Sequence, residues 1–454
     1  MHSEPNPIED RTGRIIARHG KVALMILALI LAVGFGLRLE KVVNPDPTPG
    51  ADALAYRALA ESLYEEGSYG GADFRDPTDW SPGAPLLFAA GHYVVGEVND
   101  GFARGIQALL GTAAILLVYL IAYRLAGRGP VPLLAAGLVA VYPPFIHSVG
   151  SLMSEPVAIF LLPATVLAFL WADGRGAAAW LLPGLLMGLT ALVRPEYMFV
   201  GLVLLGLIAI RRTLLTGWRQ GLLGSVAFLL AALFAIAPWT VRNQVELGRF
   251  VPITTGSGKA LFVGTYLPGD GEYQRVKALL HERATGESLD PGSGALAKVD
   301  PVPLFDRAAR AYPALERDQA LGRLGRENFE RFVRSDPLGY GAMTVRKVSR
   351  MWSSGIGKAF SSTPGRIAQI LLVLAGLAGA VMLASRGRWE ILPLGIPILV
   401  ITGIASITLA PPRRNEILMT LVLPLAALAI VALYRAAKGQ LSDGGGSAEI
   451  EPAK

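Results

Sequence analysis

Cysteine is absent from the chain of 454 residues, and charged side chains are scarce. The lack of thiols excludes disulfide bonds, a thiol nucleophile and metal sites built on cysteine. Charged residues make up only 17% of the chain, whereas a soluble domain has about 25%. Hydrophobic residues make up 52% and occur in long runs, so the composition predicts a polytopic membrane protein.

Acidic residues are the scarcer charged class, which leaves a formal net charge of +7. We assign this excess to basic cytoplasmic loops and to contact with anionic membrane lipids. A basic stripe with interleaved aromatic residues is missing from the sequence, so nucleic acid is not an expected partner.

Ten apolar stretches are candidates for membrane helices by the usual length criterion. They are residues 22–39, 105–123, 131–146, 153–171, 177–193, 197–210, 221–238, 367–384, 391–409 and 416–434. The sequence therefore predicts an all-α membrane protein with about ten transmembrane helices. The shorter apolar run 86–95 is expected to be an interfacial or re-entrant helix in the first outer loop.

The distribution of arginine and lysine among the short loops predicts the orientation. With a cytoplasmic N-terminus, the inner loops carry most of the basic residues and the short outer loops carry few. The inner set is Arg124, Arg128, Arg175, Arg211, Arg212, Arg219, Arg386, Arg388, Arg435 and Lys438. Both termini are therefore expected in the cytoplasm. The first apolar helix is expected to be retained, since it has no convincing cleavage site for a signal peptidase.

Five segments follow from these assignments. They are a cytoplasmic tail (1–20), a transmembrane module expected to be catalytic (21–241) with outer loop 40–104, a small mixed extracytoplasmic segment (242–366), C-terminal transmembrane helices (367–436) and a disordered cytoplasmic tail (437–454).

An acid, Asp52, follows the first apolar helix in the outer loop, and Tyr56 lies four residues later on the same helical face. A carboxylate at the membrane edge is suited to accept a proton from an attacking hydroxyl. The alternative is structural, because Asp52 is also placed to cap a helix over 53–66.

Further ionisable residues fall at the predicted outer ends of membrane helices, where they indicate function by default. Glu155 begins a helix before Pro156, which also suits the positive end of that helix. Arg194 and Glu196 interrupt two apolar stretches, and they either line a cleft or pair with each other.

Two arginines, Arg413 and Arg414, precede the last helix and are suited to a lipid phosphate, although a solvated turn also explains them. Arg242 and Asn243 either line the same cleft or begin the outer segment.

Three acids of the first loop, Asp73, Asp76 and Asp79, either bind a divalent metal ion or are solvated.

Several separated motifs together resemble one family. They are Asp52 with Tyr56; Ser81-Pro-Gly-Ala-Pro-Leu; Arg104; Tyr142-Pro-Pro-Phe with Ser154-Glu155; Gly188-Leu-Thr-Ala-Leu-Val-Arg194-Pro195; and Pro238-Trp-Thr-Val-Arg242-Asn243 with Gly248-Arg-Phe-Val-Pro252. Over residues 20–435 the chain resembles the C-type superfamily of polyprenyl-phosphate-sugar glycosyltransferases (GT-C fold), nearest the protein O-mannosyltransferases (glycosyltransferase family 39) and the lipid A aminoarabinose transferases.

The resemblance implies transfer of a hexose or pentose from a polyprenyl monophosphate to an acceptor in the cell envelope, which is a lipid, a glycan or a protein. It implies Asp52 as base with inversion, and either Glu155 or Asp79 as a second carboxylate; Glu155 would orient the partners of Asp52 or the acceptor. Arg194, Arg413 and Arg414 would bind the phosphate, and Tyr56, Asp79, Glu196, Arg242 and Asn243 the substrates. The sequence indicates no cofactor with certainty, and the divalent metal ion named above is the one alternative. A transporter or flippase of envelope glycolipids is the alternative, although the charges lie at the rim of the membrane and not at mid-helix.

Overall fold

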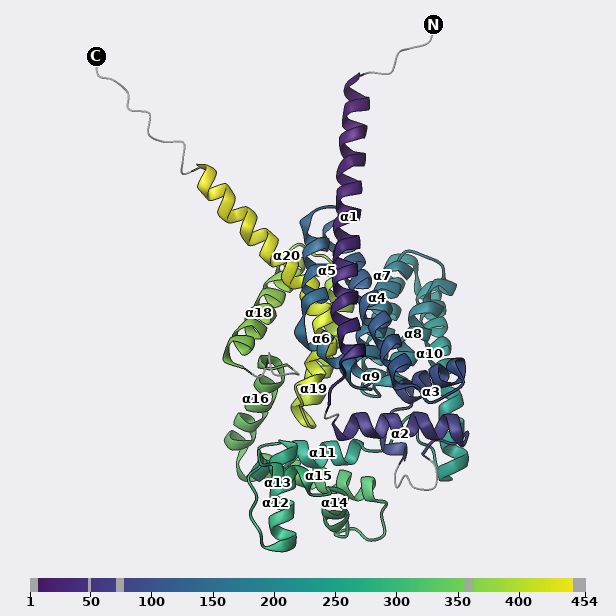
Figure 1. Cartoon of the computed structure of the whole chain (residues 1–454), viewed down its shortest axis with the longest axis vertical. Helices are drawn as coiled ribbons and strands as arrows, with labels where there is room; N and C mark the ends of the chain where they lie inside the picture. The colour runs from purple at the N-terminus through teal and green to yellow at the C-terminus, as the bar shows by residue number, and fades with distance from the viewer. Residues whose placement is uncertain (1–6, 48–49, 71–76, 356–359, 361, 444–454) are drawn as a thin grey trace, which may run out of the picture.

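The protein is a bundle of membrane helices with a smaller helical cluster at one end (Figure 1). The structure is a computed structural model that describes residues 7–47, 50–70, 77–355, 360 and 362–443. Within these residues all regular secondary structure is helical, which confirms the predicted all-α class. The tail beyond residue 443, Asp73 and Asp76 lie outside the described residues.

Seven helices of the described chain are long and apolar enough to cross a membrane. They are α1 (Pro7–Val43), α4 (Asp100–Ala126), α7 (Glu155–Ala172), α9 (Tyr197–Thr216), α10 (Trp218–Leu247), α18 (Thr363–Ser385) and α20 (Arg413–Asp443). The predicted count of about ten is not confirmed, because three of the predicted spans are short or broken.

Two of these three spans are short. One is Ala177–Val193, formed by the 3₁₀ turn η3 (Ala177–Trp180) and α8 (Leu181–Val193), and the other is α19 (Ile391–Ile407). The 17 residues of α19 rise about 25 Å, less than the roughly 30 Å hydrocarbon core of a bilayer.

The third span is bent by 50° between α5 (Pro130–Val141) and the helical segment Pro143–Gly150, which begins with α6 (Pro143–His147). If the bent pair is one span, the described chain has eight. Pro143 and Pro144 cause the break, because neither has the N–H that would donate to the carbonyls of Val139 and Ala140. The buried Arg38 of α1 replaces those donors at 3.2 Å each.

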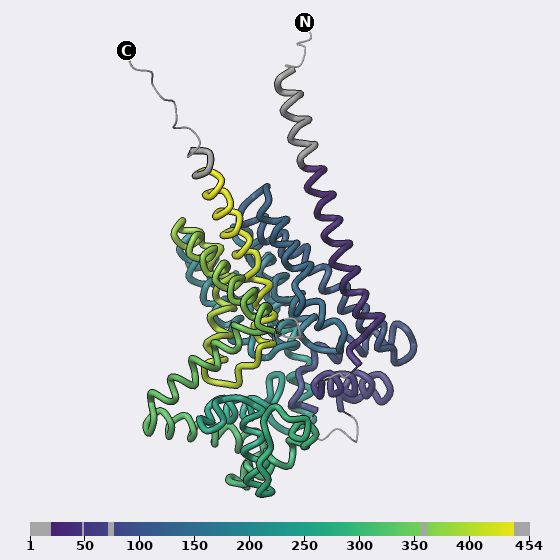
Figure 2. Tube along the Cα trace, turned by 60° about the vertical axis from the view of Figure 1, so that its left-hand side comes forward, coloured from purple at the N-terminus to yellow at the C-terminus, as the bar shows by residue number. Residues whose placement is uncertain are grey.

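The predicted cytoplasmic loops gather at one end of the bundle. Arg211 of α9 pairs with Asp173 before η3 at 2.8 Å and lies 3.8 Å from the ring centroid of Trp389, between α18 and α19. A Cβ atom at Gly129, between α4 and α5, would lie 3.9 Å from Arg435 near the end of α20. The N-terminal half of α1 and the C-terminal half of α20 project from this same end (Figures 1 and 2). The loops predicted to be cytoplasmic and the loops predicted to be outer therefore lie at opposite ends of the bundle.

The opposite end carries the outer cluster, formed by α11 (Ser257–Thr265), α12 (Tyr273–Thr285), α13 (Gly294–Lys298), α14 (Val302–Ala309) and α15 (Arg317–Ser335) (Figure 2). Phe262, Val276, Phe305 and Leu321 are among the residues of its own apolar core. The regular secondary structure of the segment expected to be mixed is thus helical throughout the residues described. The amphipathic α16 (Pro337–Ser353) connects it back to the membrane helices.

The first outer loop contributes α2 (Ala51–Glu65), the short turn η1 (Pro77–Asp79) and α3 (Gly83–Val95), and α2 packs on α3. The predicted helix over 86–95 is therefore present within α3, beside the outer cluster and not in the centre of the bundle (Figure 1).

Three segment boundaries in the structure differ from those expected from the sequence. Residues 7–20 and 437–443, expected in tails, are helical as parts of α1 and α20, and α10 continues past residue 241 to Leu247.

Candidate active site

A large cavity lies between the membrane helices and the outer cluster. Its volume is about 1590 Å³, and its wall comes from segments distributed over almost the whole chain. Basic side chains outnumber acidic ones along this wall. The basic residues are Arg194, Lys259, Arg326, Lys347, Arg350, Arg366, Arg413 and Arg414, and the acidic ones are Asp52, Asp79, Glu196, Glu272 and Asp318. A cavity with this excess of cations favours an anionic ligand.

Asp52 lies in the first turn of α2 and faces the cavity wall. The helix is preceded by Gly50, and no side-chain hydrogen bond caps it. The Asp52 carboxylate instead contacts the guanidinium of Arg413, which comes from the start of α20. The structure therefore does not support the alternative in which Asp52 caps the helix.

Tyr56 lies one turn after Asp52, as the spacing predicts. Its hydroxyl is 3.3 Å from Ser81 Oγ and donates to Ser154 Oγ, also at 3.3 Å. Ser154 in turn donates to Glu155 Oε2 at 3.4 Å. The hydroxyls of Tyr56 and Ser154 thus connect the first outer loop to Glu155 at the start of α7.

Glu155 is buried and contacts Arg194, which follows α8. Arg413 Nε lies 3.9 Å from Glu155 Oε1, so Arg413 is held between two carboxylates. Asp52, Arg413, Glu155 and Arg194 therefore form a chain of alternating charge. Burial alone would lower the pKa of Arg194, but Glu155 and Glu196 hold it above its ordinary value.

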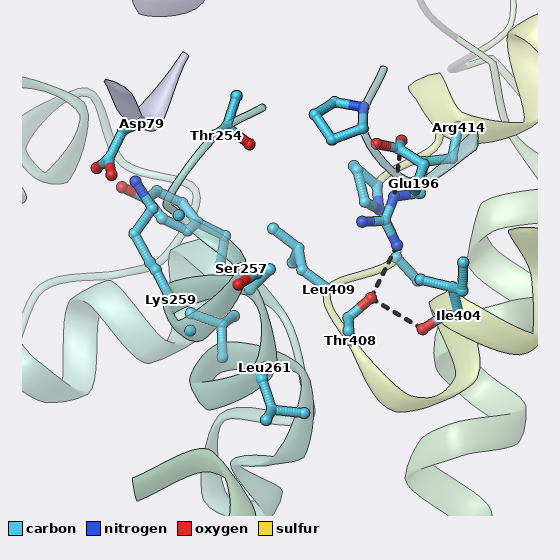
Figure 3. A pocket seen from close by; sticks show the side chains of 18 of the residues that line it. Asp79, Glu196, Thr254, Ser257, Lys259, Leu261, Ile404, Thr408, Leu409 and Arg414 are labelled. Atoms are coloured by element: carbon cyan, nitrogen blue, oxygen red, sulfur yellow. Dashed lines mark hydrogen bonds and ion pairs between the residues drawn. The ribbon is translucent and has the colours of Figure 1, made fainter. Parts of the chain in front are cut away.

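Glu196 faces Arg414 and not only its neighbour Arg194. Its Oε1 lies 3.9 Å from Arg414 Nε, and Arg414 also donates to Thr408 Oγ1 at 2.9 Å (Figure 3). Burial alone would raise the pKa of Glu196, but Arg414 and Arg194 outweigh burial and lower it. Arg414 is 13% exposed in its side chain, so it is not part of a solvated turn.

Asp79 lies on the side of the cavity formed by the outer cluster, across from Arg414 (Figure 3). Its carboxylate accepts hydrogen bonds from Arg317 at 2.6 Å and from Thr255 at 2.7 Å. This acid fixes the outer cluster to the first loop.

A divalent metal does not fit the acids described at this site. Asp52, Glu155 and Asp79 each contact an arginine, which already balances the charge that a cation would need. No group of three or more His, Asp or Glu residues within the described ranges is placed to hold a metal ion.

Arg242 and Asn243 lie in the last turns of α10, and neither lines the cavity. Arg242 donates to the carbonyl of Tyr69 at 3.4 Å, and Asn243 donates to those of Val251 and Ile253 at 3.1 and 2.9 Å. Asn243 holds the chain that follows α10, and Arg242 contacts the first outer loop. The structure does not bring either residue to the other candidate residues.

Several cavity residues were not predicted as site residues from the sequence, and Tyr273 and Lys347 are among them. Burial and the charge of Asp52 raise the pKa of Tyr273 to about 12. Lys347 lies in α16, whose basic residues at 346, 347 and 350 are visible as one side of an amphipathic helix. The basic side of this helix could have predicted a cationic wall of the cavity. The sequence around Tyr273 has no pattern that predicts a site residue.

Comparison with known proteins identifies the fold. Residues 84–250 match the family model of dolichyl-phosphate-mannose-protein mannosyltransferase. The archaeal oligosaccharyltransferase AglB from Archaeoglobus fulgidus, solved with an inhibitory peptide and a dolichol-phosphate, is similar over 95% of this chain, with 16% identity and a TM-score of 0.56. The apo form of the A. fulgidus oligosaccharyltransferase is similar over 92%, with 17% identity and a TM-score of 0.54. The chain has the fold of the C-type glycosyltransferases.

The prediction of that superfamily is thereby confirmed for the fold, and the chain is a multi-pass membrane protein. The chain spans about half the length of the archaeal enzymes it matches, 52% in both cases. ArnT from Cupriavidus metallidurans, solved with undecaprenyl phosphate, is similar over 90% of this chain and 78% of its own, with 14% identity and a TM-score of 0.41. No curated protein matches the chain.

Proposed function

We propose that the protein transfers a sugar from a polyprenyl-phosphate donor to an acceptor on the extracytoplasmic side of the cell membrane, with inversion. The observation that carries this proposal is the chain of alternating charge from Asp52 to Arg194, which four separate segments contribute. Asp52, Arg413 and Arg194 of this chain line one cavity. The dolichol-phosphate in one protein of the same fold supports a lipid phosphate as the donor.

The chemistry assigned to these residues is a displacement at the anomeric carbon of the sugar. Asp52 accepts the proton of the acceptor hydroxyl while that oxygen forms a bond to the anomeric carbon. The bond from this carbon to the phosphate oxygen breaks, and the lipid phosphate leaves with the electron pair. Attack opposite to the leaving group inverts the configuration.

The arginines stabilise the charge that develops on the leaving phosphate. Arg194, Arg413 and Arg414 stand at the membrane side of the cavity, and the side chains of Arg194 and Arg414 are largely withdrawn from water. Fixed cations in such surroundings stabilise a developing anion more strongly than water does. Glu155 orients Arg194 and Arg413 for this task.

The remaining cavity wall is assigned to substrate contacts by Tyr56, Asp79 and Glu196. A volume of about 1590 Å³ holds a sugar phosphate and part of an acceptor together. The acceptor is a lipid, a glycan or a protein of the envelope, and the outer cluster covers it during transfer.

Replacement of Asp52 by asparagine tests the assignment. Transfer of labelled sugar from polyprenyl-phosphate mannose, or from another donor on which the wild type is active, should fall by about 10²- to 10⁴-fold in membranes, the usual contribution of a general base. Glu65→Gln, an exposed acid of the same helix that does not line the cavity, should keep wild-type transfer. Full transfer by a well-expressed Asp52→Asn protein would remove Asp52 as the base.

A transporter or flippase is the competing function, and proteoliposomes distinguish the two. An enzyme forms a covalent product and moves no donor across the bilayer. Counterflow of the labelled lipid without any product would support the transporter and contradict the proposal.

A further inference from the structure

Lys347 is a buried lysine that lines the cavity although it is only 1% exposed. Its ammonium donates to the carbonyl of Gly264 in α11 at 2.7 Å. Its stem passes Gly271, where an added Cβ would lie 2.8 Å from Lys347 Cδ. Gly271 also has a φ of +61°, a conformation that favours glycine. Gly271 therefore provides the space for the stem of Lys347, and the carbonyl of Gly264 anchors its ammonium.

Lys347 and Arg414 are brought together by the junction of α16 with α20. Asn415, the residue after Arg414, donates to the carbonyls of Met351 and Ser354 at the end of α16, the latter at 2.7 Å. The start of α20 is thereby fixed to the C-terminal part of the helix that carries Lys347.

A second connection runs through the backbone at Thr408. Gly264, which accepts from Lys347, packs so closely on Thr408 that an added Cβ would lie 2.2 Å from its carbonyl carbon. Thr408 in turn accepts from Arg414. Both cations are therefore anchored to neighbouring positions on one wall.

The charge of Lys347 is not balanced by an acid in direct contact among the described residues. Asp270 is the closest candidate in its surroundings, but it binds Arg346 at 2.8 Å and Arg350 at 2.6 Å. The partner of Lys347 is a neutral carbonyl, and Glu196 lies 3.9 Å from Arg414. In the described chain Lys347 has no acid in direct contact and Arg414 shares Glu196 with Arg194, so this wall carries an excess of positive charge that favours an anion beside the two cations.

We propose that Lys347 and Arg414 form the subsite that binds the phosphodiester of the lipid donor, with Lys347 as a determinant of donor affinity. This inference rests on the proposed function, because a lipid phosphate is the anion expected in the cavity. It adds a residue from α16 to the arginines assigned above.

The titration of Lys347 gives the subsite a pH dependence. Burial, together with Arg414 and Arg350, lowers the pKa of Lys347 to about 8, and Asp270 offsets part of this effect. α11 contacts the ammonium through the carbonyl of Gly264. The ammonium is present below this pKa and is lost as the pH rises through it. A phosphodiester keeps its single negative charge over this range, so its binding weakens as the pH rises.

Binding of dihexyl phosphate to the detergent-solubilised protein tests the subsite without any transfer. The wild type should bind this diester about tenfold more tightly at about pH 6.5 than at about pH 9.5, as expected for loss of one charge-assisted hydrogen bond. Lys347→Arg should bind equally at both pH values, and Lys347→Met should bind weakly at both. Trihexyl phosphate, which has no charge, should show no such dependence.

Lys277→Met is the matched control. Lys277 is also a buried lysine that donates to a backbone carbonyl, that of Leu296 at 2.7 Å, but it lies outside the cavity wall. This variant should keep the wild-type dependence on pH. The proposal is overturned if Lys347→Met binds like the wild type, or if Lys347→Arg keeps the loss of affinity at high pH. The Asp52→Asn protein tests the two proposals independently. It should bind the diester like the wild type, whether or not its transfer activity is lost.

Discussion

Arg38 is the residue that joins the first membrane helix to the break in the third predicted span. Pro143 and Pro144 remove two N–H donors, and the guanidinium supplies two others to the same carbonyls. A buried carbonyl without a donor costs about 1–3 kcal/mol. The arginine and the two prolines therefore form one structural unit, although about a hundred residues separate them in the sequence.

Arg38→Met should consequently lower the free energy of unfolding by about 2–6 kcal/mol, since two carbonyls lose their donors. The measurement is the thermal unfolding midpoint of the purified protein in detergent. Lys21→Met, an exposed position of the same helix, should leave the midpoint unchanged. Adding Pro144→Ala to Arg38→Met should recover part of the loss, because it restores one N–H. Equal midpoints for Arg38→Met and the wild type would show that these hydrogen bonds contribute nothing.

Single residues of the site were predictable where a charge lies at the end of an apolar stretch, as Glu155, Arg194 and Arg413 do, or in the loop just after one, as Asp52 does. The structure brings these four residues into contact. Their partners were not predictable, because the sequence does not encode which distant loop faces which. Lys347 was missed for a related reason, since its burial depends on the space left by Gly271 in another segment.

At the scale of elements, close helix packing depends on small residues. α8 carries Gly184 and Gly188, and added Cβ atoms there would lie 2.2 Å from the Phe228 carbonyl oxygen and 2.5 Å from that of Ala232 on α10. This spacing of small residues lets membrane helices approach closely.

Gly184→Ala should therefore force α8 and α10 apart and cost about 1–3 kcal/mol, the usual effect of overpacking. A lower midpoint of thermal unfolding in detergent is the expected observation. Gly206→Ala on α9, where nothing lies within 4 Å of the new Cβ, is the control and should behave like the wild type. If both variants have the same midpoint of thermal unfolding as the wild type, the contact between α8 and α10 is looser than the structure indicates.

Elements of the membrane part were predicted better than those of the outer segment. Long apolar runs predicted the position of each membrane helix, because the bilayer demands length and hydrophobicity, although α1, α10 and α20 extend beyond the predicted ends. In the outer segment, α14 and α15 are separated by residues 310–316. Pro313 lies in this gap, and its missing N–H is a signal in the sequence that a helix does not continue there. The core of the outer cluster could not be predicted, because its apolar residues come from four separate short helices.

The whole molecule has two distinct ends, and the orientation we propose places the outer cluster outside the cytoplasm. Basic loops at the other end support this orientation through the positive-inside rule. The absence of cysteine makes the orientation easy to measure, because a single introduced thiol is labelled without background.

Ser288→Cys in the outer cluster should react with a membrane-impermeant maleimide in intact cells. Ser385→Cys, at the end of α18, should react only after permeabilisation. Both serines are exposed, so access to the reagent and not burial decides the result. The reverse pattern would place Asp52 and the arginines in the cytoplasm and would contradict the proposed function.

The bend between α5 and α6 also bears on how the molecule moves. In carriers that work by alternating access, broken helices near the middle of the bilayer act as hinges between rocking halves. Here the break is held in place by α1, because Arg38 donates hydrogen bonds to both carbonyls that the prolines leave without a donor. A corner held in this way keeps α5 in a fixed position against α20, which carries Arg413 and Arg414 of the cavity. Such a fixed framework suits chemistry at one position better than passage of cargo from one leaflet to the other.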